Sequence, residues 1–504
     1  MMKRLLFLIL AVTLLIPNGL FAQKKSKSPS NSDGHHLVFD IANSQDSIIF
    51  LAIYYRDKLM LKDSVTTFKQ LPQGRQFTFA GKETYQDGMY KLVSQKHYPY
   101  LDFIIDRNQH FSASLDTTGK VDDVSYVNSD ENDELLRFQR RTISAQKELT
   151  EYKKKYDSFK SANKQDSMDF YSQKMKDLNE NMEAFIWDLI NKHPDYLFSK
   201  MQRAYKAIEV PDPPKDEQGN IIDSNFQLSY YMTHFWDNID LSDGRMIFTP
   251  TFEPKIKEYF TKVLQYQEID TINKYMDMVL EKAEKDSLMY RFIVEWLSYN
   301  YQTSKIIGHD AVFVHLVKNN HMKGKCKWID EDLLKTFEKR AKRLEPLLIG
   351  KQSVELFIPD TSMTDDFSKW HSSYRLPKKY VILWFYDPDC PTCKKESKKL
   401  RAVYDSLERI GERNFDVYGI ANDADIERWK KYVRENNFPW LNVGGNKGNV
   451  DYLEVYNIYE SGNPQMFILN EKRQIILNKR IEMNAIPTFL KEYEKREALK
   501  NRKK

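Results

Sequence analysis

Two of the three cysteines, Cys390 and Cys393, lie in the stretch C-P-T-C. Two thiols at this spacing serve one of three purposes: exchange of disulfides with other thiols, half of a zinc site, or a static disulfide. A structural zinc ion takes four ligands, and no histidine occurs within twenty residues after Cys393. The motif therefore favours a reactive dithiol over a metal site and leaves the static disulfide as the alternative.

Disulfide exchange needs a thiolate, so the position of the first cysteine matters. The continuous apolar run "YVILWFY", Tyr380–Tyr386, predicts a strand buried on both faces just before the motif. A helix follows, and its apolar stripe consists of Leu400, Val403, Leu407 and Ile410, with Gly411 at its end. Cys390 then lies at the first turn of this helix, where unpaired N–H groups favour negative charge. We assign Cys390 as the attacking nucleophile and Cys393, one turn later, as the resolving thiol.

The residues between and beside the cysteines suit the same chemistry. Pro391 fixes φ at a value that fits the first turn of a helix. Thr392 carries a hydroxyl within reach of either sulfur. The charged neighbours have both signs, namely Lys394 and Lys395 on the helix and Asp387 and Asp389 before it. The sequence does not decide whether these charges together favour or oppose the thiolate.

Glu396 stands three residues after Cys393 and is therefore its neighbour on the helix. A buried carboxyl group at this position would exchange a proton with Cys393 during the reaction. An exposed one would simply pair with Lys399. Both interpretations remain open, and Glu396 is kept as a candidate catalytic residue.

The N-terminus has the pattern of an export signal. Two basic residues, Lys3 and Arg4, precede an apolar run over residues 5–16, whose twelve residues are too few to span a bilayer. Ala22 offers a cleavage site, and no cysteine lies near it for a lipid anchor. We predict a signal peptide over 1–22, a linker over 23–34 and a periplasmic protein that is not a lipoprotein. An uncleaved membrane anchor is the alternative.

Composition indicates a globular protein of several domains, since 30% of the 504 residues are charged and 41% are hydrophobic. The net charge of +5 comes partly from the ends of the chain, and no groove-binding motif accompanies it. We therefore expect no nucleic-acid partner. The sequence also lacks a P-loop and a dinucleotide fingerprint, so we expect no small-molecule cofactor.

The chain changes character twice. Short runs rich in β-branched and aromatic residues predict a small antiparallel β-sandwich over 35–126. Helical periodicity then predicts an all-α domain over 127–350. Its clearest apolar stripes are Met182–Phe185–Ile186–Leu189–Ile190, Ile256–Tyr259–Phe260–Val263–Leu264, Ile272–Tyr275–Met276–Val279–Leu280 and Met289–Phe292–Ile293–Trp296–Leu297. We expect these stripes to form a core rather than to line a ligand groove.

The last domain, 351–497, is followed by a basic tail over 498–504. It has the predicted order β-α-β-α-β-β-α, with C-x-x-C at the first strand-to-helix joint. In "CKKE" and "YNIYESGNPQMFIL" it resembles thioredoxin-like proteins, specifically envelope disulfide reductases of the TlpA/ResA type. The resemblance implies that Pro464 is a cis proline facing the dithiol, and that the backbone of Asn463 pairs with an incoming chain. The first two domains resemble, more loosely, those of multi-domain envelope thioredoxins.

The sequence departs from this family around the cysteines. Trp384 stands where thioredoxins keep a buried acid, Asp389 where a tryptophan precedes the first cysteine, and Lys398 where a proline kinks the helix. Asn463 and Gln465 flank Pro464 where threonine is common.

We predict a periplasmic thiol–disulfide oxidoreductase that reduces protein disulfides and is recharged by a membrane electron donor. The alternative is an envelope binding or scaffold protein whose last domain has little or no turnover. The third cysteine, Cys326, is expected to be inert rather than regulatory.

Overall fold

A computed structural model describes residues 34–362, 366–423 and 425–502. The predicted signal peptide and nearly all of the predicted linker lie outside the described residues. The described chain forms two compact units. The first runs to Ile53 and continues over Met60–Ala184; the second comprises Tyr54–Leu59 and everything from Phe185 onward. This division falls inside a helix and differs from the boundaries predicted after residues 126 and 350.

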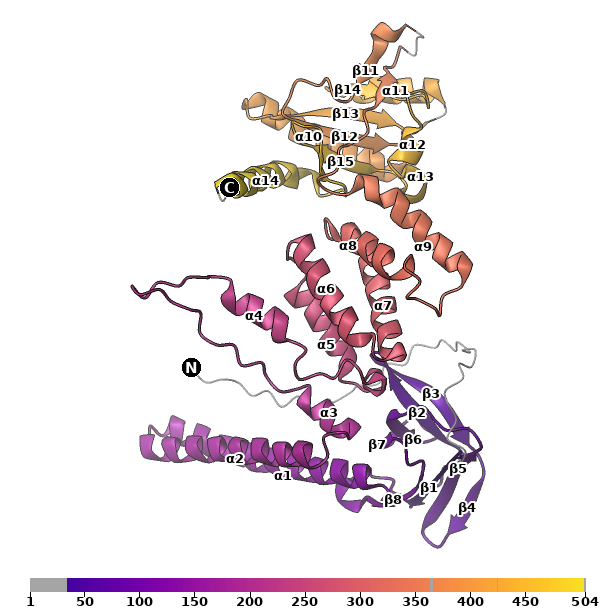
Figure 1. The fold of residues 1–504 in the computed structure, drawn as a ribbon, viewed down its shortest axis with the longest axis vertical. Helices are drawn as coiled ribbons and strands as arrows, with labels where there is room; N and C mark the ends of the chain where they lie inside the picture. Colours follow the sequence, from indigo (N-terminus) through magenta and orange to yellow (C-terminus); the bar gives the residue numbers. More distant parts are fainter. Residues whose placement is uncertain (1–33, 363–365, 424, 503–504) are drawn as a thin grey trace. The chain divides into compact units, whose positions relative to one another are not determined.

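The N-terminal strands form two sheets, as the sequence predicted (Figure 1). One sheet has the order β4-β5-β1-β8-β9 and the other β3-β2-β6-β7. The strands are β1 (His35–Ala42), β2 (Ile49–Tyr55), β3 (Lys58–Val65), β4 (Phe68–Leu71), β5 (Gly74–Gly81), β6 (Gly88–Val93), β7 (Pro99–Ile105), β8 (His110–Asp116) and β9 (Ser125–Val127). The first sheet is not antiparallel throughout, because β1 and β8 pair in parallel.

Aromatic rings fill the space between these two sheets. Phe39 of β1 and Phe103 of β7 are fully buried with ring centroids 5.3 Å apart, and Phe111 of β8 lies 6.0 Å from Phe103. Two long helices follow, α1 (Asp130–Ser161) and α2 (Gln165–Lys192). Buried Asn132 of α1 exchanges two hydrogen bonds of 2.7 Å with the backbone of Ile104, so its side chain gives the edge strand β7 a partner.

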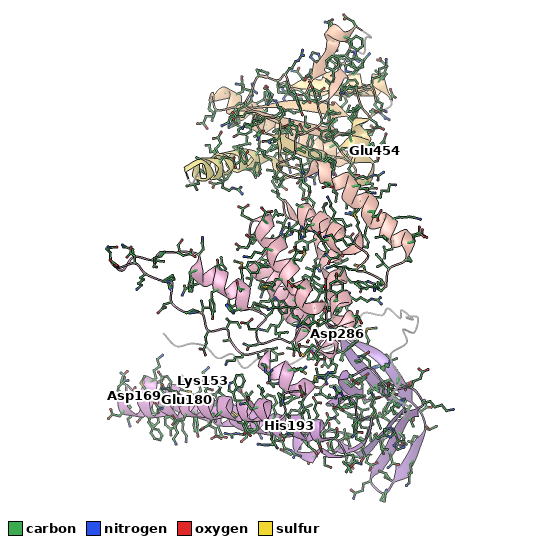
Figure 2. All side chains as sticks on the ribbon, viewed as in Figure 1. Lys153, Asp169, Glu180, His193, Asp286 and Glu454 are labelled. Atoms are coloured by element: carbon green, nitrogen blue, oxygen red, sulfur yellow. The ribbon has the colours of Figure 1, made fainter. Side chains whose placement is uncertain are left out.

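The middle of the chain is helical, as predicted, and most residues of its apolar stripes are buried, with Phe185, Ile186 and Val263 half-buried. The helices are α3 (Leu197–Arg203), α4 (Phe226–His234), α5 (Phe252–Glu258), α6 (Ile269–Ala283), α7 (Ser287–Gln302), α8 (His309–Leu316) and α9 (Glu331–Leu344). The stripe that begins at Ile256 does not stay α-helical, because it passes into a π turn at Tyr259–Val263. Asp286, labelled in Figure 2, caps α7 by accepting hydrogen bonds from the N–H groups of Leu288 and Met289.

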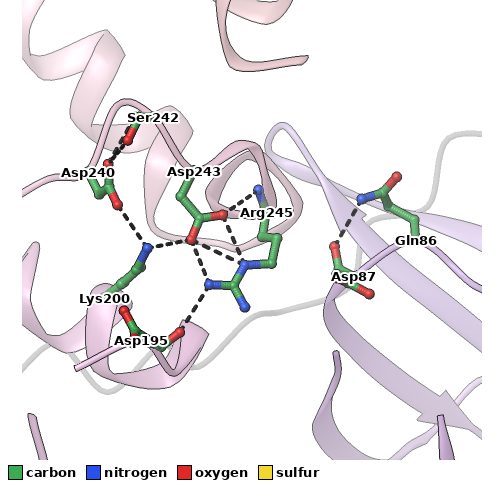
Figure 3. Close-up of polar contacts among 8 residues, drawn as sticks. All are labelled: Gln86, Asp87, Asp195, Lys200, Asp240, Ser242, Asp243 and Arg245. Carbon is green, nitrogen blue, oxygen red and sulfur yellow. Dashed lines mark hydrogen bonds and ion pairs between the residues drawn. The ribbon is translucent and has the colours of Figure 1, made fainter. Parts of the chain in front are cut away.

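An ion-pair network fixes the start of this helical region (Figure 3). Lys200 of α3 donates to Asp240 at 2.8 Å and to Asp243 at 2.7 Å, and Arg245 also pairs with Asp243 at 2.6 Å. Burial alone would raise the pKa of Asp243, but the hydrogen bonds and charges of Arg245 and Lys200 hold it at about 2. The ion pairs of Asp243 therefore connect α3 to the loop after α4 at every pH at which this carboxylate stays ionised.

The C-terminal part contains a mixed sheet of order β14-β13-β12-β15-β16 (Figure 1). Its strands are β12 (Tyr380–Tyr386), β13 (Phe415–Ala421), β14 (Leu441–Val443), β15 (Gln465–Leu469) and β16 (Ile475–Leu477). Its helices are α10 (Pro391–Arg409), α11 (Ile426–Asn436), α12 (Tyr452–Val455), α13 (Ile458–Ser461) and α14 (Ile486–Arg502). The predicted helix end is confirmed, since Gly411 has a φ of +70° just after α10.

The central strand β12 is apolar throughout because both faces of the sheet are covered. Its alternate residues Tyr380, Ile382, Trp384 and Tyr386 belong to a core shared with α10, α11 and α14. The residues between them, Val381, Leu383 and Phe385, belong to a second core shared with α12, α13 and the segment around Leu356. The run predicted as a doubly buried strand is therefore confirmed.

Sequence reasoning missed some short elements. Strand β14 and the helices α12 and α13 were not predicted, nor was the hairpin of β10 (Phe357–Pro359) and β11 (Trp370–Ser372). Three or four residues give too little periodicity for such elements to stand out. The closing helix α14 continues to Arg502, into the segment predicted as a basic tail.

The strand directions bring three loops to one edge of the sheet. β12 and β13 run in parallel, with Tyr386 beside Ala421, so their carboxyl ends lie together. β15 is antiparallel to β12 and starts at Gln465 beside Phe385. The segments that follow β12, follow β13 and precede β15 therefore meet at this edge, and these segments carry the C-x-x-C motif and Pro464.

We expect Trp384→Ala to destabilise the C-terminal part by about 3–5 kcal/mol, because this indole is fully buried at the centre of the sheet. Urea unfolding of the full chain, followed by circular dichroism, measures the loss. Tyr459→Ala is the matched control, since Tyr459 is 64% exposed, and we expect it to change the unfolding free energy by less than about 0.5 kcal/mol. Equal shifts for the two variants would contradict the assignment of Trp384 to the core.

Candidate active site

Cys390 lies where the sequence placed it, immediately before α10. It is the N-cap residue of that helix, and its sulfur accepts a hydrogen bond from the N–H of Cys393 at 3.3 Å. Its side chain is partly exposed, and no disulfide joins it to Cys393. An N–H donor and a helix start both favour negative charge on a sulfur at this position. Cys390 thus has the access and the setting of a nucleophile.

Cys393 is in a different environment from Cys390. It is fully buried, and burial raises the pKa of its thiol to about 12, although the backbone N–H of Asp387, 3.4 Å from the sulfur, lowers it in part. A thiol in this setting stays protonated at neutral pH. The two cysteines therefore differ in accessibility, and the roles of nucleophile and resolving thiol assigned from the sequence stay predictions.

Pro464 lies opposite the motif. The bond between Asn463 and Pro464 is cis, as the family resemblance implied. The carbonyl oxygen of Asn463 lies 3.9 Å from the sulfur of Cys390, where the thiol can donate to it. The side-chain oxygen of Asn463 is buried and has no hydrogen-bond partner among the described residues. These contacts put the backbone before Pro464 directly beside the exposed sulfur.

Glu396 combines both of the settings that the sequence left open. It is 8% exposed, so the carboxyl group is buried, and it also pairs with Lys399 at 2.8 Å. The hydrogen bond to Glu396 raises the pKa of Lys399. Glu396 lies one turn after Cys393 on α10. Its proposed exchange of a proton with Cys393 stays a prediction.

The residue beneath the cysteines is an indole. Trp384 shares a buried core with Cys393, and its N–H donates to the hydroxyl of Ser397 at 3.0 Å. A second buried hydrogen bond joins the N–H of Trp429 on α11 to the hydroxyl of Tyr386 at 3.0 Å. Each of these two indole N–H groups thus has a hydrogen-bond partner, and neither indole offers a base to Cys393.

The structure adds a charged group that sequence reasoning missed. Arg428 of α11 pairs with Asp389 at 2.7 Å and with Asp423, whose side chain is fully buried. Asp423 follows β13, and its hydrogen bond raises the pKa of the Arg428 guanidinium further. The sequence contained one signal for this group. An acid-rich stretch follows a predicted strand, and the end of a strand parallel to β12 lies at the same edge of the sheet as the C-x-x-C motif.

The structure also shows the surroundings of Pro391, Thr392 and Cys326. Pro391 is the first residue of α10, and both it and Thr392 are exposed beside the cysteines. Within the described chain, the Thr392 hydroxyl makes no hydrogen bond to either sulfur. Cys326 is 4% exposed, and burial raises the pKa of its thiol to about 12. This environment favours an inert thiol.

Among the described residues, no group of three or more His, Cys, Asp or Glu side chains is arranged to hold a metal ion. No helix in the same residues is both long enough and apolar enough to cross a membrane.

A C-x-x-C pair at a helix start, facing a cis proline across the edge of a mixed sheet, defines a domain of thioredoxin type. Residues 378–476 match the family described as Thioredoxin-like. Residues 172–341 match a domain of unknown function, DUF5106. No curated protein sequence matches the chain.

Several solved structures are similar to the chain. A thioredoxin-like protein from Bacteroides caccae is 17% identical with a TM-score of 0.41, and the match covers 56% of this chain and 98% of that one. A domain of a possible thiol-disulfide isomerase from Cytophaga hutchinsonii is 31% identical with a TM-score of 0.26, covering 31% and 98%. The thioredoxin domain of a thiol-disulfide oxidoreductase from Bacteroides vulgatus is 22% identical with a TM-score of 0.24, covering 28% and 96%.

We predict that iodoacetamide at pH 7 labels Cys390 at least about tenfold faster than Cys393 or Cys326. The two buried thiols, whose pKa values are raised to about 12, carry almost no thiolate at that pH. Mass spectrometry of peptides from the reduced chain measures the three rates, and labelling in urea is the control that exposes all three thiols. Equal labelling of Cys390 and Cys393 in the folded chain would refute the division of roles.

Proposed function

We propose that this protein is a periplasmic thiol–disulfide oxidoreductase that reduces disulfides in other proteins. The observation that carries the proposal is the unequal pair of thiols at the start of α10. Cys390 is accessible and accepts an N–H hydrogen bond, whereas Cys393 is buried behind it. Export of the chain rests on the basic and apolar pattern at its N-terminus.

The reaction transfers two electrons from the dithiol to the substrate disulfide. The Cys390 thiolate attacks one substrate sulfur, so a mixed disulfide forms and the other substrate sulfur leaves as a thiolate that takes up a proton. Cys393 then loses its proton and attacks the sulfur of Cys390. This step breaks the mixed disulfide, forms the bond between Cys390 and Cys393, and releases the second substrate thiol.

The second step needs a group that accepts the proton of Cys393. Its thiol is buried with a raised pKa of about 12, and Trp384 stands beneath it instead of an acid. Glu396 is buried and lies one turn after Cys393 on α10. It carries the first carboxylate that follows Cys393 in this helix. We assign Glu396 this role; its carboxylate also pairs with Lys399 at 2.8 Å.

The substrate would bind along the backbone before Pro464. The carbonyl of Asn463 is next to the sulfur of Cys390, so an extended chain paired there would bring its own disulfide to the nucleophile. Pro391 and Thr392, both exposed, would form the opposite side of the contact. A chain of this kind must be recharged after each turnover, and we propose that a membrane protein donates the electrons.

A second candidate function is a binding or scaffold role with little turnover. The apolar layer of Trp384 under Cys393 favours it, because a resolving thiol that stays protonated would release mixed disulfides slowly. The two functions share the attack of Cys390 on a substrate disulfide. They differ in how fast Cys393 then releases the substrate.

Insulin reduction distinguishes them. We expect the wild-type chain to reduce insulin disulfides in the presence of dithiothreitol at a rate that Cys390→Ser lowers to background, because the nucleophile is lost. Cys326→Ser is the matched control and should retain the full rate, since its thiol is buried away from the reaction. Background rates for both the wild type and Cys390→Ser would favour the scaffold role.

Trapping tests the same chemistry with natural substrates. We expect Cys393→Ser, expressed in the periplasm, to hold other proteins as mixed disulfides on Cys390, because the resolving attack is lost. Non-reducing gels with and without dithiothreitol measure the adducts, and Cys390→Ser/Cys393→Ser is the control. Adducts of equal amount in this double variant would show that they do not form through Cys390.

A further inference from the structure

Asp389 places a negative charge directly before the nucleophile. A carboxylate there opposes formation of a thiolate on Cys390, and the only cations that the sequence placed near it were Lys394 and Lys395 on the same helix. The structure adds a cation on a different helix. Nη1 of Arg428 lies 2.7 Å from Oδ2 of Asp389, whereas Lys394 on α10 approaches Asp389 only to 3.9 Å.

The guanidinium of Arg428 is held in place from behind. Its Nε donates to Asp423 at 2.8 Å and its Nη2 donates to the other oxygen of the same carboxylate, which makes a forked pair. Asp423 is fully buried, and Trp429, the next residue along α11, is anchored to Tyr386 at the end of β12. Nη1, which Asp423 does not engage, contacts Asp389, so a buried carboxylate holds the other side of this half-exposed guanidinium.

We infer that Arg428 is a positioning residue that cancels the charge of Asp389 and thereby keeps Cys390 reactive as a nucleophile. The inference rests on the proposed function and extends it to a residue outside the C-x-x-C and cis-proline loops. It also assigns Asp423 a role, which is to fix the Arg428 side chain across the edge of the sheet.

Other groups face Cys390 and act together with this pair. The backbone N–H of Cys393 and the carbonyl of Asn463 contact the sulfur of Cys390, and Tyr432 of α11 lies near it. The charged residues next to Cys390 in sequence are Asp387, Lys394 and Lys395, and the backbone groups of Asp387 and Lys394 bond to Cys390. Lys394 and Lys395 are the other cations in this set, and Lys394 approaches Asp389 only to 3.9 Å. Removing Arg428 therefore leaves the charge of Asp389 less fully offset, and the thiolate loses stabilisation.

The test measures Cys390 directly, in the full chain carrying Cys393→Ser so that one accessible thiol remains. We expect Arg428→Gln to slow alkylation by iodoacetamide at pH 7 and low salt by about three- to fivefold, because the rate follows the thiolate fraction. Lys430→Gln is the matched control. It removes the same charge from the same helix, but Lys430 pairs with Glu427 and not with Asp389.

A double variant separates charge from structure. If Arg428 acts through Asp389, then Asp389→Asn should restore the rate of Arg428→Gln to within about twofold of the original, and Arg428→Lys should keep most of the rate. Because Arg428→Gln leaves buried Asp423 without its partner, its fold is checked by near-ultraviolet circular dichroism. Should it fail to fold, Asp389→Asn alone must raise the alkylation rate.

Three results would overturn the inference: an unchanged rate in Arg428→Gln, an equal loss in Lys430→Gln, or an equal loss with and without Asp389→Asn. Failure of the proposed function would look different. In that case Cys390 of the wild type would be alkylated no faster than Cys326, whatever stands at position 428.

Discussion

One hydrogen bond, from the N–H of Cys393 to the sulfur of Cys390, marks the junction on which the account depends. It exists because a doubly buried strand, β12, delivers the chain to the edge of the sheet and a helix starts there at once. The same edge receives the end of β13 and the start of β15, since β13 is parallel and β15 antiparallel to β12. These strand directions bring the partly exposed sulfur of Cys390 and the cis proline together at this edge, next to the start of α11, which carries Arg428.

Few side chains at the site can accept or donate a proton. Around Cys393 the core consists of Trp384 and other apolar residues, and burial keeps the thiol protonated. The charged groups lie on the outer side, where Asp389 and Arg428 meet. Tuning of the nucleophile is thus a surface effect that salt will weaken, whereas the resolving thiol is controlled by burial, which salt does not change.

Much of this arrangement could be predicted from the residues. The continuous apolar run of Tyr380–Tyr386 indicated a strand covered on both faces, and the stripe after Cys390 indicated the helix. The cis bond at Pro464 came from the resemblance and not from any local signal. The short strand β14 and the hairpin of β10 and β11 were missed, because three residues carry no measurable period.

Ion pairs between distant segments could not be predicted in the same way. Asp389 and Arg428 are far apart in the sequence, and many aspartates and arginines could have formed such a pair. Likewise, Glu396 was expected to be either buried or paired with Lys399, and it is both. A charge on a long side chain is placed by the tertiary structure, which single-sequence patterns do not contain.

A redox titration of the full chain against glutathione, with acid quenching and mass spectrometry of the thiols, measures the proposed chemistry. We expect one reversible two-electron step confined to Cys390 and Cys393, with Cys326 remaining reduced, at a potential well below the roughly −120 mV of strong oxidants. A potential near that value would contradict the reductase assignment. Absence of any reversible step between Cys390 and Cys393 would contradict the account as a whole.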